Sequence, residues 1–229
     1  MTRAWCGARL AASFHRLRRD ESGLALMEFA FTLPLILAMG GYGGELSNYA
    51  LTQMRVSQIA LNLADNASRV GVDSGLQTVQ LREADINDVF AASRLEGAGV
   101  NLTTYGRVTL SSLEGQSDGK QLLHWQRCIG LKSDSGYGSS YGNAGSGDTG
   151  IYVTGGMGDA DAKVVSPPSS GVMFVEINYE YQPLFGKLFM KPTKIHYIAS
   201  FIVRDKRDFT KVWNPAPTAT ASTCSTYTA

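Results

Sequence analysis

The sequence has few of the residues from which charged interfaces and catalytic sites are built. Its 229 residues include only three histidines and three cysteines, and the formal net charge is +1. Beyond the first stretch of the chain, basic residues are mixed with acidic ones, which argues against the basic surface of a nucleic-acid-binding protein. The histidines, His15, His124 and His196, lie far apart, and His124 beside Trp125 is interpreted as a surface or half-buried residue of a strand. We therefore expect no nucleic acid among the partners.

Catalytic motifs are also scarce. Residues 145–150 match the G-x-G-x-x-G pattern of dinucleotide-binding proteins, but no strand precedes them and no helix follows. The same segment contains Asp148-Thr149-Gly150, a triplet seen in aspartic proteases, but that chemistry needs two facing carboxylates and the sequence has one such triplet. Asp159-x-Asp161 lacks the remaining oxygen ligands of a calcium loop. We expect no catalytic residues, no cofactor, no metal site and no enzymatic activity.

One long apolar run, residues 23–44, dominates the chain. It is interrupted by a single carboxylate, Glu28, and a single proline, Pro34. As a helix, residues 24–42 would reach roughly 29 Å, about the thickness of the hydrocarbon core of a bilayer. Five arginines precede the run, against Asp20 and Glu21: Arg3, Arg9, Arg16, Arg18 and Arg19. The positive-inside bias therefore predicts a basic cytoplasmic leader, residues 1–23, and a single membrane span with everything after it outside the cytoplasm.

The residues after the run argue against cleavage by an ordinary signal peptidase. No Ala-x-Ala site follows, and the run ends in the glycine-rich segment 40–44, a possible soft joint. A helical period then continues, so that residues 24–70 are expected to form a membrane-spanning helix extended by an amphipathic one. The residues expected on its buried face are Leu46, Tyr49, Gln53, Val56, Ala60, Leu63, Ala67 and Val70.

The cysteines fit an exported domain. Cys6 lies in the leader, whereas Cys128 and Cys224 lie in the part expected outside, where oxidation is permitted. A disulfide between Cys128 and Cys224 would close a loop of almost a hundred residues and contribute on the order of 4 kcal/mol to stability. Two unpaired thiols are the alternative.

Residues 71–213 are expected to form a single α+β domain. Asp73 or Ser74 could cap a second helix over residues 81–95, and residues 107–113 and 121–129 read as two strands of a hairpin. Residues 130–168 are rich in Gly, Ser, Asp and Tyr, which indicates an exposed loop, a partner-binding excursion or a disordered segment.

The clearest strand patterns come late in the chain. Residues 172–181 and 194–204 alternate apolar and polar side chains, as in strands with one buried face, and the short connection between them favours antiparallel pairing. The tail, residues 214–229, is expected to be flexible except where Cys224 holds it.

The start of the apolar run resembles the processing site of type IV prepilins, in which cleavage follows a glycine and a glutamate is fifth in the mature chain. Here the glycine is Gly23, the first mature residue is Leu24 and the glutamate is Glu28, followed by Phe29. The wider run through Pro34, with Glu45 near its far end, resembles the TadE-like pseudopilins of the tight adherence (Tad) pilus system.

The last strands add a looser resemblance to that family. It rests on Tyr179-x-Tyr181-x-Pro183-Leu184 and on the strand ending at Arg204. In residues 40–44 the sequence has glycines where the family usually has larger apolar residues. The resemblance implies a pilin-like α+β fold, with a long N-terminal membrane helix followed by a small antiparallel sheet.

Glu28 and Pro34 each admit two interpretations. An ionised carboxylate within a bilayer costs roughly 2.5 to 3.5 kcal/mol on insertion scales, so Glu28 either pairs with the Leu24 amine after cleavage or reaches the cytoplasmic interface. Pro34 leaves the Ala30 carbonyl without its helical donor, which either produces a kink or melted turn used in assembly or is simply tolerated. The sequence leaves both pairs of interpretations open.

By resemblance, we expect a minor pseudopilin that is processed by a prepilin peptidase and takes part in assembling a Tad-type adherence pilus. Its expected partners are that peptidase, the major pilin and other pseudopilins, the Tad inner-membrane assembly platform and membrane lipid. The expected location is the bacterial inner membrane, or the pilus after assembly. The alternative is an uncleaved membrane-anchored protein whose outer domain binds a ligand or envelope partner.

Overall fold

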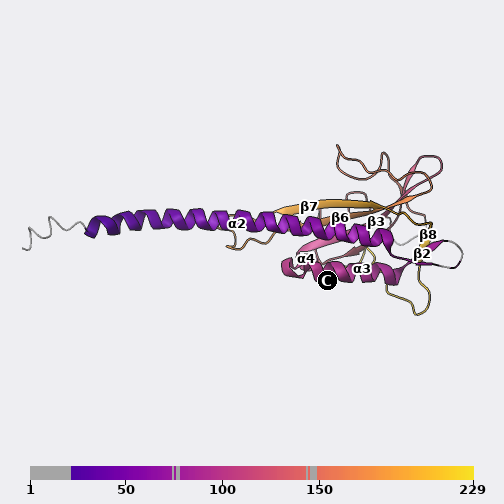
Figure 1. The fold of residues 1–229 in the computed structure, drawn as a ribbon, viewed down its shortest axis with the longest axis horizontal. Helices are drawn as coiled ribbons and strands as arrows, with labels where there is room; N and C mark the ends of the chain where they lie inside the picture. The colour runs from indigo at the N-terminus through magenta and orange to yellow at the C-terminus, as the bar shows by residue number, and fades with distance from the viewer. Residues whose placement is uncertain (1–21, 74, 76–77, 143, 145–148) are drawn as a thin grey trace, which may run out of the picture. The chain divides into compact units, whose positions relative to one another are not determined.

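The computed structural model describes residues 22–73, 75, 78–142, 144 and 149–229 of the chain (Figure 1). Most of the expected leader, Ser74 and most of the glycine-rich motif 145–150 lie outside these residues. The chain divides into two compact units, Met1–Ser47 and Asn48–Ala229. We call residues 48–229 the head. The boundary falls inside the first helix, so the second half of this helix belongs to the head.

The first helix, α2, spans Ser22–Arg69 without interruption. Pro34 lies inside it and residues 40–44 are helical, so neither the proline nor the glycines melt a turn. A proline removes only one backbone hydrogen bond, and the bonds on either side of it can hold the helix together. Every residue from 23 to 40 is exposed.

Within the head, α2 buries one face. Its buried side chains follow the helical period: Thr52, Val56, Ile59, Ala60, Leu63, Ala64, Ala67 and Ser68. Leu46 and Gln53, which the period places on this face, are exposed. The neighbouring residues Glu45 and Thr52 are buried instead, so the buried face lies one position earlier than the sequence pattern suggests at both places.

A five-stranded antiparallel sheet forms the centre of the head. Its strand order is β5 (Ile151–Tyr152), β4 (Gln121–Ile129), β3 (Gly106–Gly115), β6 (Gly171–Glu180) and β7 (Lys194–Ile202). The two hairpins expected from the sequence are present: β3 pairs with β4, and β6 pairs with β7 in a register that places Val175 opposite Ala199. The coarse expectation of a long apolar helix followed by a small antiparallel sheet is therefore confirmed.

Both helices of the head pack on the same face of this sheet. The second helix, α3, spans Glu83–Gly97 and is followed by the short helices η1 (Ala98–Val100) and α4 (Leu102–Tyr105). Phe90 of α3 and Leu63 of α2 share a core with Val175 and Ile177 of β6. Helix packing thus buries the apolar side of the strands.

The start of α3 differs from the expectation. Its N-cap is Arg82, not Asp73 or Ser74, and the backbone N–H of Arg82 donates to the Asp85 carboxylate at 3.0 Å. The residues before it, Val79–Arg82, form strand β2 instead of a first helical turn. This contact is one half of a capping box, in which the side chain of the third helical residue accepts from the backbone N–H of the N-cap residue.

A second sheet, which the sequence analysis did not predict, joins distant segments. It has the order β1 (Val72–Asp73), β2 and β8 (Arg207–Trp213), and β2 runs parallel to β8. Arg207 of β8 donates from its guanidinium to the carbonyls of Ala67, Ser68 and Val70 at 2.9 to 3.1 Å. A cation at these carbonyls satisfies acceptors that the helix end leaves unpaired.

The described part of the glycine-rich segment 130–168 covers the other face of the five-stranded sheet. Tyr141 packs edge-on against Phe174 with 5.7 Å between ring centroids, and its hydroxyl donates to the Gly158 carbonyl at 2.8 Å. Glu176, fully buried on this face of β6, accepts hydrogen bonds from the Ser139 hydroxyl at 2.5 Å and the Ser140 backbone at 2.9 Å. The described part of the segment is thus a packed layer, and both faces of β6 are buried where the alternation suggested one.

Candidate functional site

The five residues singled out for processing and assembly all lie on α2: Gly23, Leu24, Glu28, Phe29 and Pro34. All are exposed, and Leu24 and Phe29 expose 59% and 58% of their surface. A side chain built on Gly23 would meet nothing within 4 Å. The peptide bond between Gly23 and Leu24 is therefore not covered by any of the described residues.

Leu24 and Glu28 are one helical turn apart. Residues four apart in a helix are neighbours on its surface, so a free amine on Leu24 would lie within reach of the Glu28 carboxylate. Glu28 has no ion pair with any other residue that the structure describes. The geometry suits a carboxylate whose counter-ion is created by cleavage or supplied by another chain.

Two hydroxyl groups of this helix segment are satisfied by its own backbone. The Thr32 hydroxyl donates to the Phe29 carbonyl at 3.3 Å, and the Ser47 hydroxyl donates to the Gly43 carbonyl at 2.9 Å. Internal pairing of this kind is what an apolar medium demands of a polar side chain. Among the described residues, α2 is the one helix long and apolar enough to cross a membrane.

A second functional feature is the C-terminal tail, which is bound to the edge of β4. Cys128 of β4 and Cys224 of the tail form a disulfide. The Cys128 backbone N–H donates to the Ser222 carbonyl, and that of Gly130 donates to the Thr228 carbonyl, both at 2.7 Å. The tail is therefore held at several points, not at Cys224 alone as the sequence analysis expected.

Arg107 of β3 holds the end of the tail. Its guanidinium donates to the carbonyls of Thr226 at 2.9 Å and Cys224 at 2.7 Å, and it lies 4.2 Å from the ring centroid of Tyr227. Burial lowers the pKa of Arg107 from its usual value, because the charged form loses its hydration. These groups line a cavity of about 290 Å³ beside the disulfide.

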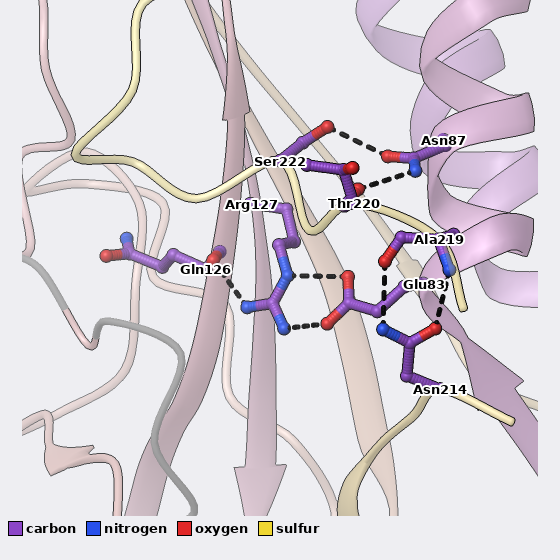
Figure 2. A network of polar contacts seen from close by, with 8 residues as sticks. All are labelled: Glu83, Asn87, Gln126, Arg127, Asn214, Ala219, Thr220 and Ser222. Carbon is purple, nitrogen blue, oxygen red and sulfur yellow. Dashed lines mark hydrogen bonds and ion pairs between the residues drawn. The ribbon is translucent and has the colours of Figure 1, made fainter.

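The other end of the tail contacts α3, as Figure 2 shows. The Asn87 amide donates to the Thr220 carbonyl and its side-chain oxygen accepts from the Ser222 hydroxyl, both at 2.8 Å. A turn closed by Asn214 and Ala219 precedes these contacts. Because α3 and Cys128 belong to different sides of the sheet, the tail passes around the β4 edge and covers backbone groups that would otherwise be unpaired.

A buried ion pair between Arg127 of β4 and Glu83 of α3 lies next to the tail (Figure 2). The Arg127 Nε donates to Glu83 at 2.9 Å, and a second guanidinium nitrogen completes a two-pronged contact. Both side chains are almost completely buried. The two-pronged geometry fixes the orientation of the helix on the sheet. Removal of either partner would leave a buried charge without a counter-ion. The sequence analysis missed it, since the two residues are 44 positions apart.

His124 is buried, not half-exposed as the sequence analysis expected. Its Nδ1 lies 3.0 Å from both carboxylate oxygens of Glu114, and the Ser112 hydroxyl donates to the same carboxylate at 2.9 Å. The carboxylate stands between the serine and the histidine, so His124 is not placed to activate Ser112 as a nucleophile. The described residues also contain no group of three or more His, Cys, Asp or Glu side chains that could hold a metal ion.

Comparisons with protein-family models, with curated proteins and with solved structures find no match to this chain. The functional interpretation therefore depends on the residues themselves.

Proposed function

We propose that this protein is a TadE-like minor pseudopilin, anchored in the inner membrane by α2, processed after Gly23 and used in the assembly of a Tad-type adherence pilus. The observation that carries the proposal is the exposed apolar half of α2 with a single carboxylate, Glu28, at the fifth position after Gly23. A helix that is apolar on all sides must be covered by lipid or by other apolar helices. Bundling of such helices in a filament core supplies that cover.

The head supports the same proposal. It is an α+β unit in which the end of α2 packs on an antiparallel sheet, the arrangement that the resemblance to pilins implies. Its disulfide suits an exported domain. The prepilin peptidase, the major pilin, other pseudopilins and the assembly platform are the partners that this role requires.

N-terminal sequencing of the mature protein tests the proposal. In cells that contain the prepilin peptidase, the mature chain should begin at Leu24, and Gly23→Leu should leave it uncleaved. Gly40→Leu is the matched control, because it changes a glycine of the same helix away from the expected cleavage site. Recovery of the intact chain in the presence of active peptidase would support the alternative of a permanently anchored binding domain.

A further inference from the structure

The loop that joins β6 to β7, residues 182–193, exposes a cluster of large apolar side chains. Leu188 exposes 77% of its surface, Leu184 62% and Phe185 50%. The rings of Phe185 and Phe189 pack edge-on with 5.7 Å between centroids, which groups the apolar side chains together. A soluble domain rarely displays such a group of neighbouring side chains without an interaction to make.

Lysines accompany the apolar cluster. Lys187 and Lys191 are exposed, and no acidic residue occurs between Tyr181 and Lys194. Neither lysine forms an ion pair with a residue that the structure describes. Gly186, with φ of 61°, allows the tight turn between Phe185 and Lys187 at a conformation that other residues rarely adopt. Leucine and phenylalanine flanked by lysine are typical of segments that bind at a membrane surface.

The loop lies at the end of the head where the chain enters it. Asn48, the first residue of the head, donates from its amide to the Tyr181 hydroxyl at 2.7 Å, and Tyr49 packs edge-on against the same ring. Leu184 lines a cavity of about 200 Å³ together with Asn48 and Leu51. The loop and the entry point are therefore neighbours.

The apolar run ends close to this entry point along the chain. Gly44 precedes Asn48 by four residues. Four residues span at most about 14 Å in any conformation. If the run crosses a bilayer, the loop lies near its polar surface whatever the arrangement of the link.

We propose that residues 183–191 form a membrane-contacting loop, in which Leu184, Phe185 and Leu188 enter the lipid surface and Lys187 and Lys191 bind anionic headgroups. This inference rests on the membrane anchor of the proposed function, but not on processing or pilus assembly. A lipid surface fits better than a protein groove because the lysines carry no acidic counterparts in the loop and because the apolar run ends only four positions before the first residue of the head. Each lysine near an anionic surface strengthens the contact by roughly fivefold.

The test is a fluorescence measurement on the full chain, reconstituted into vesicles of phosphatidylcholine with phosphatidylglycerol. Cys6→Ser leaves Cys128 and Cys224, which are joined in the disulfide, as the remaining native cysteines. An environment-sensitive probe is then attached to the new thiol of Leu188→Cys. Val165→Cys is the control, because Val165 exposes 57% of its surface and lies away from the loop, beside the β4–β5 end of the sheet. Quenching by spin-labelled lipids reports contact of the probe with the bilayer.

We expect lipid quenching at position 188 and none at position 165. In the Leu188→Cys chain, Lys187→Gln with Lys191→Gln should lower the ratio of quenched to unquenched probe by about 25-fold in anionic vesicles and much less in phosphatidylcholine alone. Equal quenching at both positions, or a blue-shifted probe at 188 that lipids do not quench, would overturn the proposal, and the second result would indicate a protein partner. Resistance of the chain to alkaline extraction from the vesicles checks the anchor separately, so failure of the loop and failure of the anchor are distinguishable.

Discussion

The two halves of α2 differ in their exposure. In the first half every residue from 23 to 40 is exposed, with Ile36 at 64% and Met39 at 76%. In the second half Val56 and Leu63 are at most 2% exposed, and the exposed side mixes polar residues such as Arg55 with apolar ones such as Leu51. The second half is built to cover one sheet, whereas the first is built for surroundings that are apolar on every side. One helix therefore joins an exposed apolar segment, long enough to cross a membrane, to a folded head.

The largest expected effect comes from Glu28, the single charged residue among the exposed residues 23–40. Glu28→Leu should leave membrane insertion intact or improved, because it removes a carboxylate from an apolar segment. If Glu28 neutralises the Leu24 amine during subunit docking, pilus formation should be lost, since a buried cation without a partner is strongly unfavourable. Glu28→Gln should also fail, because an amide can accept a hydrogen bond but cannot neutralise the amine.

The measurement for Glu28 is pilus formation and surface adherence at equal amounts of processed protein in the membrane. Met27→Leu is the control, because it changes a neighbouring exposed residue and leaves the charge in place. Normal pili with Glu28→Leu would show that Glu28 only reaches the interface, and its assembly role would then be withdrawn.

The second effect concerns the head, which has a covalent constraint that the first half of α2 lacks. Cys128→Ser with Cys224→Ser should lower the free energy of unfolding by about 4 kcal/mol, because the disulfide closes a long loop and its loss frees the unfolded chain. Urea unfolding followed by the fluorescence of Trp125 and Trp213 measures this change. Thiol labelling of the unaltered protein without reductant should modify neither cysteine, and labelling of both would show that the tail is not covalently held.

The elements that could be predicted from the sequence are those marked by a local pattern of apolar and polar residues. The alternation in residues 172–181 and 194–204 defined β6 and β7, because period two is a property of the strand itself. It also suggested that only one side of β6 is buried. The cover over the polar side depends on contacts such as Ser139 with Glu176, 37 residues apart, which composition does not reveal. The glycine and serine content left open an exposed loop, a partner-binding excursion or a disordered segment, and it did not reveal that the described part packs on the sheet.

Apart from the Arg82 cap of α3, the missed features are non-local. Strand β8 pairs in parallel with β2, so Arg207 lies opposite Val79 although more than a hundred residues separate them. The tail is held through Arg107 and Asn87, which gain carbonyl partners only once the sheet and α3 are assembled. For the candidate site the reverse holds, since Gly23, Leu24 and Glu28 are a local motif and the structure adds only their exposure and shared helical face.

A matched pair of leucines tests the comparison within α2 directly. Leu63→Ala should destabilise the head by about 2 to 5 kcal/mol, because it removes buried methyl groups and leaves a cavity in the core. Leu37→Ala, at a position 64% exposed, should change the unfolding of the head by less than about 0.5 kcal/mol. Urea unfolding of both variants gives the two values. Equal losses in the free energy of unfolding would contradict the conclusion that only the second half of the helix packs in the core of the head.

The smallest expected effect is on the free energy of unfolding and concerns Tyr179, in the core beneath α2. Its pH dependence separates the contribution of burial from that of the hydrogen bond. Its hydroxyl donates to the Val100 carbonyl at 2.8 Å, so Tyr179→Phe should cost about 1 kcal/mol at neutral pH. Burial raises the pKa of Tyr179 to about 12, whereas an unfolded tyrosine ionises near pH 10. Between these values the unfolded state binds fewer protons than the folded state, so the unaltered protein loses stability as the pH rises, by up to about 1.4 kcal/mol per pH unit.

The phenylalanine variant lacks this ionisation. Its deficit should therefore shrink and then reverse as the pH rises from neutrality to about 11. Paired urea titrations of the two proteins across that range measure the difference in free energy of unfolding. A difference that stays constant would mean that Tyr179 has the same pKa in the folded and unfolded states. Burial in the core that α2 covers would then not raise the pKa of its hydroxyl.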